Sequence, residues 1–348
     1  MTPILDFIIS LSFMFLLVSL IVSALTELVS QALDLRGRML YYSIAKLLDN
    51  KDEYNWGEMF YKHPSIKQIR QDKLPIKLGI FGNFKKRFPS YIAPAIFSQV
   101  LIDTIRFWDN VKSLHQPLTE LTEAHIKELV QSLPEGEMKR SLVSALSVAM
   151  MKGTSALVAI EQWYSDYMNR VSGWYTRKVG FISFLLAFCV SIAFNINTIN
   201  VAKELWGNKE LLTASADMVS GSYQNFNSDN FNPSSSDWTP LMDSTRMLAI
   251  KQKIDEVKLV RSEIDRLTSM GYPIGWSKSL FESVKSNTDA TKEKVSTFKR
   301  CCDDGLVLFL SVLGWLTTAV MAYMGAPFWY DVLNKIVPLR KTGNAPKA

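Results

Sequence analysis

One helical pattern runs without a break from residue 160 to residue 195, and its composition changes halfway from amphipathic to fully apolar. In the first half, IEQWYSDYMNRVSGWYTRK, apolar and aromatic residues recur at the three-and-four spacing of one helix face. The second half, VGFISFLLAFCVSIAFN, is apolar all round, as a helix in lipid must be, because hydrocarbon cannot hydrogen-bond an exposed backbone amide. The pattern predicts one helix of about 40 residues, roughly 60 Å long, with its second half in a bilayer.

Two further apolar runs have the length of about 20 residues that a helix needs to cross a bilayer. The first, residues 4–29, lacks the basic segment that opens a secretory signal, so we expect a retained anchor. The other covers residues 305–324. The sequence therefore predicts transmembrane helices at residues 1–30, 179–200 and 305–326. Their apolar content explains how a chain that is 48% hydrophobic also carries 21% charged residues.

Two carboxylates, Asp6 and Glu27, lie close to the two ends of the first apolar run. Ionisable side chains inside a membrane segment are rare and are functional candidates. Near the ends of the run, however, they can reach the water of the headgroup layer. We expect this interfacial placement for both.

The distribution of basic residues predicts the orientation, because Lys and Arg flank membrane helices mainly on the cytoplasmic side. The segment 31–178 carries 21 basic and 15 acidic residues, the segment after Ala326 carries four and one, and the segment 201–304 carries 14 and 15. We expect a multi-pass protein of the bacterial inner (plasma) membrane, with its N-terminus outside and its C-terminus in the cytoplasm. The basic residues nearest the membrane weigh most, and they are Arg36, Arg38, Arg177, Lys178, Lys335, Arg340 and Lys341.

Residues 31–178 are expected to form a cytoplasmic helical bundle. Apolar residues keep helical spacing up to residue 48, so the first helix continues past the membrane or bends at Gly37. The stretch 73–88, rich in Gly, Pro and Lys, is predicted to be a loop whose basic residues are solvated or touch headgroups.

Prolines and a turn signal divide the rest of this domain into helices. Pro64 and Pro94 each suit the first turn of a helix, where a missing amide proton costs nothing. Two shorter amphipathic helices follow, separated by a turn at residues 134–136. We expect them to pack on the long helix.

The segment 201–304 is predicted to be periplasmic. Within it, residues 214–240 are dominated by Ser, Asn and Asp without an apolar face, so ordering them would cost more entropy than burial offsets. We therefore expect disorder or a mobile loop there, and a helix over residues 241–270. Residues 327–348 are predicted to be a cytoplasmic basic tail. The fold class is all-α, with three transmembrane helices and a helical cytoplasmic bundle.

The residues that usually carry chemistry form no known catalytic pattern. The chain has no GxGxxG, P-loop, GxSxG or HExxH sequence. His125 has Glu123 two positions before it and Glu128 three positions after it, but the chain lacks the repeated Glu-x-x-His pattern of a di-metal site in a helical bundle. The sequence gives no reason to assign a catalytic residue, a metal ligand or a cofactor, and it favours a role other than catalysis.

The densest cluster of functional candidates lies in the first half of the long helix. Asp166 and Arg170 stand four positions apart and are expected to pair on one helix face. One hypothesis makes this cluster a surface for a partner helix or for lipid, and the other makes the aromatic residues bundle core and the charges its solvated rim. The candidate interaction surface comprises His63, Tyr91, Trp163, Asp166, Arg170, Trp174 and Arg177.

Four stretches together resemble a widespread set of uncharacterised bacterial integral membrane proteins. They are FYKHPSIKQIR, PSYIAPAIFSQVLID, IEQWYSDYMNRVSGWYTRK and LGWLTTAVMAYMGAPFWYDVLNKIVPLR. The shared features are an HP-x-I motif, a PSYIP-like motif, an IEQW…RVSGWY helix and a final GAPFW motif. The resemblance implies the same order of anchor, cytoplasmic region and last crossing, and it implies no activity.

Architecture without catalytic signatures favours a non-catalytic binding or scaffold subunit of a membrane complex. The expected partners are the lipid bilayer and a protein partner or a second copy of the chain. Nucleic acid is not expected, because basic residues are interleaved with acidic ones. The alternatives are a channel or transporter subunit acting as an oligomer, and a membrane-bound envelope or lipid enzyme using His63 or the Asp166 region.

Overall fold

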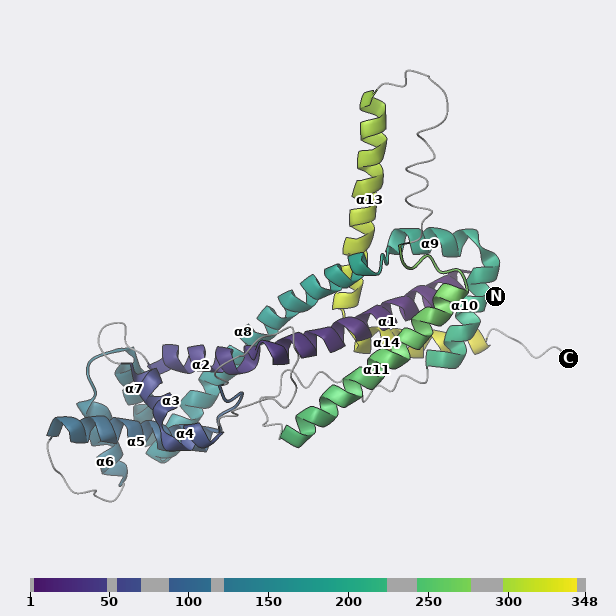
Figure 1. The fold of residues 1–348 in the computed structure, drawn as a ribbon. Helices are drawn as coiled ribbons and strands as arrows, with labels where there is room; N and C mark the ends of the chain where they lie inside the picture. The colour runs from purple at the N-terminus through teal and green to yellow at the C-terminus, as the bar shows by residue number, and fades with distance from the viewer. Residues whose placement is uncertain are drawn as a thin grey trace. The chain divides into compact units, whose positions relative to one another are not determined.

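A computed structural model describes residues 3–48, 55–69, 88–113, 122–223, 243–276 and 297–342. These residues form helices and short connections with no strand among them, which confirms the all-α class. The chain divides into two compact units (Figure 1). Unit 1 comprises Met1–Val29, Val179–Ser234 and Met242–Ala348, and unit 2 comprises Ser30–Lys178 and Ser235–Leu241.

The long helix predicted from the sequence is confirmed as α8, Ala156–Ala193, a single helix of 38 residues. The first apolar run forms α1, Pro3–Ala32. Among the described helices, α1 and α8 are each long and apolar enough to cross a membrane. The described residues give a third span if Leu308–Tyr323 and Ala326–Arg340, which are joined at a bend of 86°, are counted as one. The protein thus has the helices of a membrane protein.

One helix covers residues 305–323 of the third crossing expected over residues 305–326, and the 86° bend follows it. Helix α13, Thr297–Tyr323, ends before Gly325, whose φ of +90° is a conformation that suits glycine, and α14, Ala326–Thr342, begins directly after it. The predicted basic tail is therefore mostly helix. Its apolar side joins the core of unit 1 through Trp329, Leu333 and Val337.

Unit 1 is organised around α1, most of whose apolar stretch is buried. In Figure 1, α14 lies along α1, and the rings of Phe15 and Trp329 meet with centroids 4.7 Å apart. Ser10 of α1 hydrogen-bonds Ser215 at 2.7 Å. The helices that supply the remaining cover are α9, Thr198–Gly207, α10, Lys209–Ser222, and α11, Asp243–Ser269. Protein contacts thus cover most of the apolar surface of α1.

Part of the segment predicted to be disordered is helical. Residues 209–222 form α10, with Leu211, Ala216 and Val219 buried against the core of unit 1, so the prediction for residues 214–240 is wrong over the first nine positions. Asn208 caps this helix by accepting from the amides of Glu210 and Leu211. Small Ala and Ser side chains, which suggested disorder, here permit close packing. Residues 224–240 lie outside the described part.

A buried ion pair joins the start of α1 to the end of α14. Arg340 Nε donates to Asp6 Oδ1 at 2.7 Å, and both side chains are almost fully buried. The guanidinium also reaches Asp217 at 2.7 Å and donates to Ser220 Oγ at 3.0 Å. This differs from the expectation that Asp6 reaches headgroup water and that Arg340 flanks the membrane.

The chain turns sharply between α8 and α9. Asn195 adopts a φ of +47°, which Asn tolerates better than most residues, and the side chain of Asn197 caps α9 by accepting from the amides of Ile199 and Asn200. Thr198 and Thr318 hydrogen-bond through their hydroxyls at 2.7 Å, which ties this corner to α13. Gly314 lies directly against the Asn197 side chain.

The described residues of unit 2 form six helices besides the first half of α8. They are α2, Leu35–Leu48, α3, Trp56–Lys62, α4, Pro64–Ile69, α5, Pro94–Ser113, α6, Glu123–Ser132, and α7, Glu137–Lys152. Pro64 and Pro94 open α4 and α5 as predicted, and the predicted turn at residues 134–136 separates α6 from α7. The predicted loop at 73–88 lies outside the described residues, apart from Phe88.

The break between α1 and α2 falls at residues 33–34 and not at Gly37. Asp34 has a φ of +48°, and its carboxylate accepts from the Phe88 amide at 3.2 Å. Gly37 lies inside α2, where an added Cβ would come within 2.6 Å of the Phe88 carbonyl oxygen. The glycine therefore serves close packing, whereas Asp34 makes the turn.

Aromatic side chains fill the core of unit 2. Tyr164 of α8 stacks on Phe97 of α5 with ring centroids 4.0 Å apart, and its hydroxyl donates to the Ile92 carbonyl at 3.1 Å. Phe60 meets Phe97 at 5.1 Å. The apolar face predicted for the first half of the long helix is thus bundle core, as one of the two hypotheses stated.

Candidate interaction surfaces on α7 and α8

The seven residues proposed from the sequence do not form one surface. Trp163 and Asp166 line a groove between α7 and α8, whereas Arg170, Trp174 and Arg177 lie around a separate hollow further along α8. His63 and Tyr91 belong to neither.

The remaining two candidates have structural contacts. His63 ends α3, its Nδ1 accepts from the Ser65 amide at 3.3 Å, and its Nε2 is 3.8 Å from the Asp103 carboxylate. Tyr91 precedes α5 and lies near Tyr164, whose pKa is raised mainly by burial and to a smaller extent by the Tyr91 phenol. Among the described residues no group of three His, Cys, Asp or Glu could hold a metal ion.

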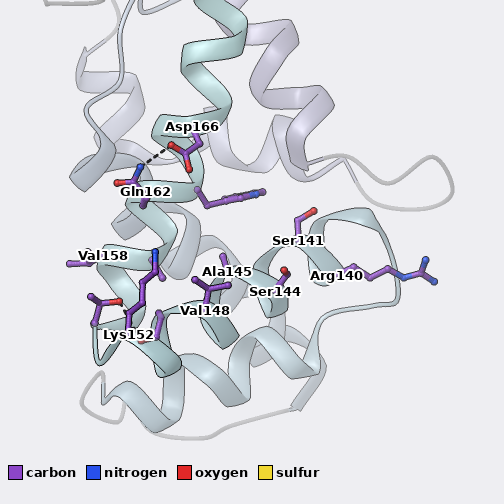
Figure 2. A pocket seen from close by; sticks show the side chains of 13 residues that line it. Arg140, Ser141, Ser144, Ala145, Val148, Lys152, Val158, Gln162 and Asp166 are labelled. Carbon is purple, nitrogen blue, oxygen red and sulfur yellow. Dashed lines mark hydrogen bonds between the residues drawn. The ribbon is translucent and has the colours of Figure 1, made fainter.

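The groove between α7 and α8 has a volume of about 820 Å³ and is open along one side (Figure 2). Small side chains make it: Ser141, Ser144 and Ala145 on α7 face Ala159 on α8, which leaves room that larger residues would fill. The full wall includes Arg140, Ser141, Ser144, Ala145, Val148, Ala149, Lys152 and Thr154, and on α8 Val158, Ala159, Gln162, Trp163 and Asp166.

Apolar side chains in the middle of this groove face solvent. Val148 is 45% exposed and Val158 is 50% exposed, and on the neighbouring face of α7 Met151 is 88% exposed. Trp163 is half-buried in the groove wall. Several exposed apolar side chains gathered on one helical unit are a feature of surfaces that bind another molecule.

The charges around the groove are unequal. Arg140 and Lys152 stand at opposite ends of the α7 wall, and no ion pair is found for either among the described residues. The one carboxylate in the wall, Asp166, accepts from Gln162 Nε2 at 2.8 Å, the bond drawn in Figure 2. Near Arg140, the Lys139 ammonium donates to Glu135 at 2.9 Å and lowers the pKa of that carboxyl, with a smaller effect from Arg140.

The hollow on α8 is a second, smaller feature, of about 470 Å³. It is lined by Asn169, Arg170, Gly173, Trp174, Thr176 and Arg177. Gly173 makes its floor, since an added Cβ there would meet nothing within 4 Å. Trp174 is covered on one side by Lys46 of α2, whose ammonium lies 5.8 Å from the ring centroid.

The predicted pair between Asp166 and Arg170 is not formed. Asp166 is bound by Gln162, whereas the Arg170 guanidinium lies over the Tyr167 ring, 5.7 Å from its centroid. A cation over an aromatic face is attracted by the ring quadrupole, which explains this choice at an exposed site. Arg170 remains exposed to solvent.

Sequence reasoning missed the α7 side of the groove. A signal was present, because Val143, Val148, Met150 and Met151 place apolar residues on faces of α7 that the buried stripe of Leu142 and Leu146 does not use. Such excess apolar residues on a short amphipathic helix point to a second contact surface.

Comparison of the chain with protein-family models, with curated proteins and with solved structures gives no match, so the resemblance to bacterial integral membrane proteins stays a prediction.

Proposed function

We propose that this protein is a non-catalytic binding or scaffold subunit of the bacterial inner membrane, which recruits a protein partner through the groove between α7 and α8. The observation that carries the proposal is the groove itself, because it combines a volume of about 820 Å³ with exposed Val148 and Val158. The small side chains of Ser141, Ser144, Ala145 and Ala159 leave space in this groove where a partner helix can lie, the helix-in-groove mode of recognition.

The charges favour an acidic amphipathic helix as the occupant. Arg140 and Lys152 are twelve positions apart on α7, so their Cα atoms are separated by about 18 Å along the helix axis. A partner helix with an apolar stripe can cover Val148 and Val158, while carboxylates near its two ends meet the two cations. Asp166 is the single carboxylate in a wall that also carries Arg140 and Lys152, so the groove keeps a net positive charge.

For the orientation, we propose that unit 2 lies in the cytoplasm and the N-terminus outside, as the excess of basic residues over 31–178 favours. The same charge count placed Arg340 in the cytoplasm. Its ion pair with Asp6 supports a different proposal: the two residues touch, so Arg340 lies at the same depth as the start of α1, on the outer side. The bend at Gly325 then makes α13 and α14 a re-entrant pair.

Single cysteines test this orientation in a chain whose three native cysteines are replaced. We expect a membrane-impermeant maleimide to label Thr2→Cys and Gly343→Cys from the periplasmic side, and to label Met151→Cys only after lysis. Labelling of Met151→Cys in intact spheroplasts would contradict the cytoplasmic placement of unit 2. Opposite accessibility of Thr2→Cys and Gly343→Cys would contradict the re-entrant pair.

Site-specific photocrosslinking tests the groove. A benzophenone side chain is placed at Val148, inside the groove, and as a matched control at Met150, which is 63% exposed on another face of α7. We expect one protein adduct from Val148, none from Met150, and loss of the adduct in an Arg140→Glu/Lys152→Glu variant. Equal adducts from both positions, or an adduct that survives the charge reversal, would contradict the proposal. An adduct of twice the chain mass would show that the partner in the groove is a second copy of this chain and not another protein.

A further inference from the structure

The hollow on α8 has the residue types of a site for an anionic group. Arg170, Gly173, Trp174 and Arg177 follow the i, i+3, i+4, i+7 spacing, so they lie on one face of the helix. Arg170 and Arg177 stand one turn on either side of Gly173, where the missing side chain leaves the floor open. Both arginines are exposed, and among the described residues no carboxylate pairs with either of them.

The lining contains no acidic residue and offers further donors. Thr176 and Asn169 border the hollow and can donate through a hydroxyl and an amide. Arginine is the side chain best suited to a phosphate, because its planar fork donates two parallel hydrogen bonds. Lys46 adds a third positive charge where it lies over Trp174. These residues therefore favour a ligand that carries a phosphate group with at least one negative charge.

The position of the hollow along α8 decides between a soluble phosphate and a lipid. The apolar half of α8 begins at Val179, two residues or about 3 Å of helix rise after Arg177. Phe181, 69% exposed, and Leu185, 51% exposed, continue this half with side chains available to acyl chains. The headgroup layer of one leaflet is roughly 6 Å thick, so the long side chain of Arg177 reaches into it. Trp174 matches the preference of indole rings for this layer.

We propose that Arg170 and Arg177, with Trp174 between them, bind the phosphate of an anionic phospholipid headgroup whose acyl chains lie along the apolar half of α8. The site goes beyond the groove and uses none of its residues. The lipid site requires that α8 crosses the membrane, whereas partner binding in the groove does not require it. The two proposals can therefore fail separately.

The test measures lipid retained by the full chain purified in dodecyl maltoside. Phosphatidylglycerol is added, and native mass spectrometry reports bound lipid for the wild-type protein and for an Arg170→Gln/Arg177→Gln variant. Each basic side chain at an anionic lipid surface contributes a factor of roughly five in affinity, so the variant is expected to bind about 25-fold more weakly. The matched control is Arg140→Gln/Lys152→Gln, which removes the same charge from the groove and is expected to bind as the wild type does.

Three outcomes would overturn the site: equal binding by the Arg170→Gln/Arg177→Gln variant, an equal loss in the Arg140→Gln/Lys152→Gln control, or displacement of phosphatidylglycerol by millimolar inorganic phosphate. The last outcome would assign the hollow to a soluble anion. Exposed arginines contribute little to folding, and thermal unfolding at the wild-type temperature is expected for both variants. An Arg170→Lys/Arg177→Lys variant keeps the charge without the fork and is expected to recover most of the binding.

Discussion

Arg340 and Asp6 stand 334 positions apart in the chain and form an ion pair of 2.7 Å in the interior of unit 1. Their side chains are 7% and 3% exposed. Removing one member of such a pair leaves the other charge buried without its partner, which typically costs about 3–5 kcal/mol. We therefore expect Arg340→Met to lower the thermal unfolding temperature of the detergent-solubilised protein by about 10 °C.

The exposed Lys335 of the same helix supplies the control for this prediction. Lys335→Met removes one positive charge from α14 without breaking a buried pair, and we expect an unchanged unfolding temperature. The double variant Asp6→Leu/Arg340→Met removes both charges and is expected to be more stable than Arg340→Met alone. Equal effects of Arg340→Met and Lys335→Met would show that the pair is not buried as described.

A second prediction concerns the close approach of Gly314 to Asn197. A methyl group at position 314 would overlap the Asn197 side chain, which is fixed by hydrogen bonds to two amides and to the Ser311 carbonyl. We expect Gly314→Ala to destabilise unit 1 by about 1–3 kcal/mol, measured by thermal unfolding. Gly221→Ala in α10 is the control, because a Cβ there meets nothing within 4 Å. A gain of stability at Gly314→Ala would refute the contact.

Two tyrosines of unit 2 whose hydroxyl groups are buried are expected to respond oppositely to loss of those groups. The Tyr164 hydroxyl donates to the Ile92 carbonyl, whereas no described residue hydrogen-bonds the Tyr61 hydroxyl. A buried polar group without a partner costs about 1–3 kcal/mol, so Tyr61→Phe is expected to raise the free energy of unfolding by about 1 kcal/mol. Tyr164→Phe is expected to lower it by a similar amount. The same sign for both variants in thermal unfolding would count against these assignments.

The same two tyrosines predict instability at alkaline pH. Burial raises the pKa of Tyr61 and of Tyr164 above the ordinary value near 10, with smaller contributions from neighbouring phenols. Because the pKa is higher in the folded state, their contribution to stability is complete below about pH 10 and is lost as the pH rises above it, when only the unfolded chain ionises.

Unfolding temperatures recorded between pH 8 and pH 11 measure this effect. We expect a flat profile up to about pH 10 and a fall above it, at up to roughly 1.4 kcal/mol per pH unit for each tyrosine. The double variant Tyr61→Phe/Tyr164→Phe is expected to reduce the fall but not abolish it, because burial also raises the pKa of Tyr167 and Tyr272, whereas Tyr42→Phe, at a site 68% exposed, is expected to keep it in full. A fall of undiminished size in the double variant would place its origin elsewhere.

Local patterns predicted most of the helices. The long helix, the helix starts at Pro64 and Pro94 and the turn at residues 134–136 were predictable because spacing and proline geometry act within a few residues. The α10 helix was not, since its Ala and Ser residues have low apolar content and gain stability only where they pack closely on another element.

Long-range contacts could not be predicted from the sequence. Nothing near Asp6 or Arg340 indicates that the two residues meet, and counting charges along the chain treated Arg340 as solvated. The candidate surface was predicted in part, because the residues on α8 were identified from the sequence. The groove also depends on the opposite wall, which α7 supplies. A single sequence does not say which faces of two helices are adjacent.

The oxygen and the nitrogen of the Asn197 side chain bond partners that are synthesised at different times. Its oxygen caps α9 through residues two and three positions later, so that half of the joint can form as soon as this stretch leaves the ribosome. Its amide donates to Ser311, 114 positions further on, which arrives much later in synthesis. The corner between α8 and α9 can therefore form early in synthesis, and α13 docks onto it later.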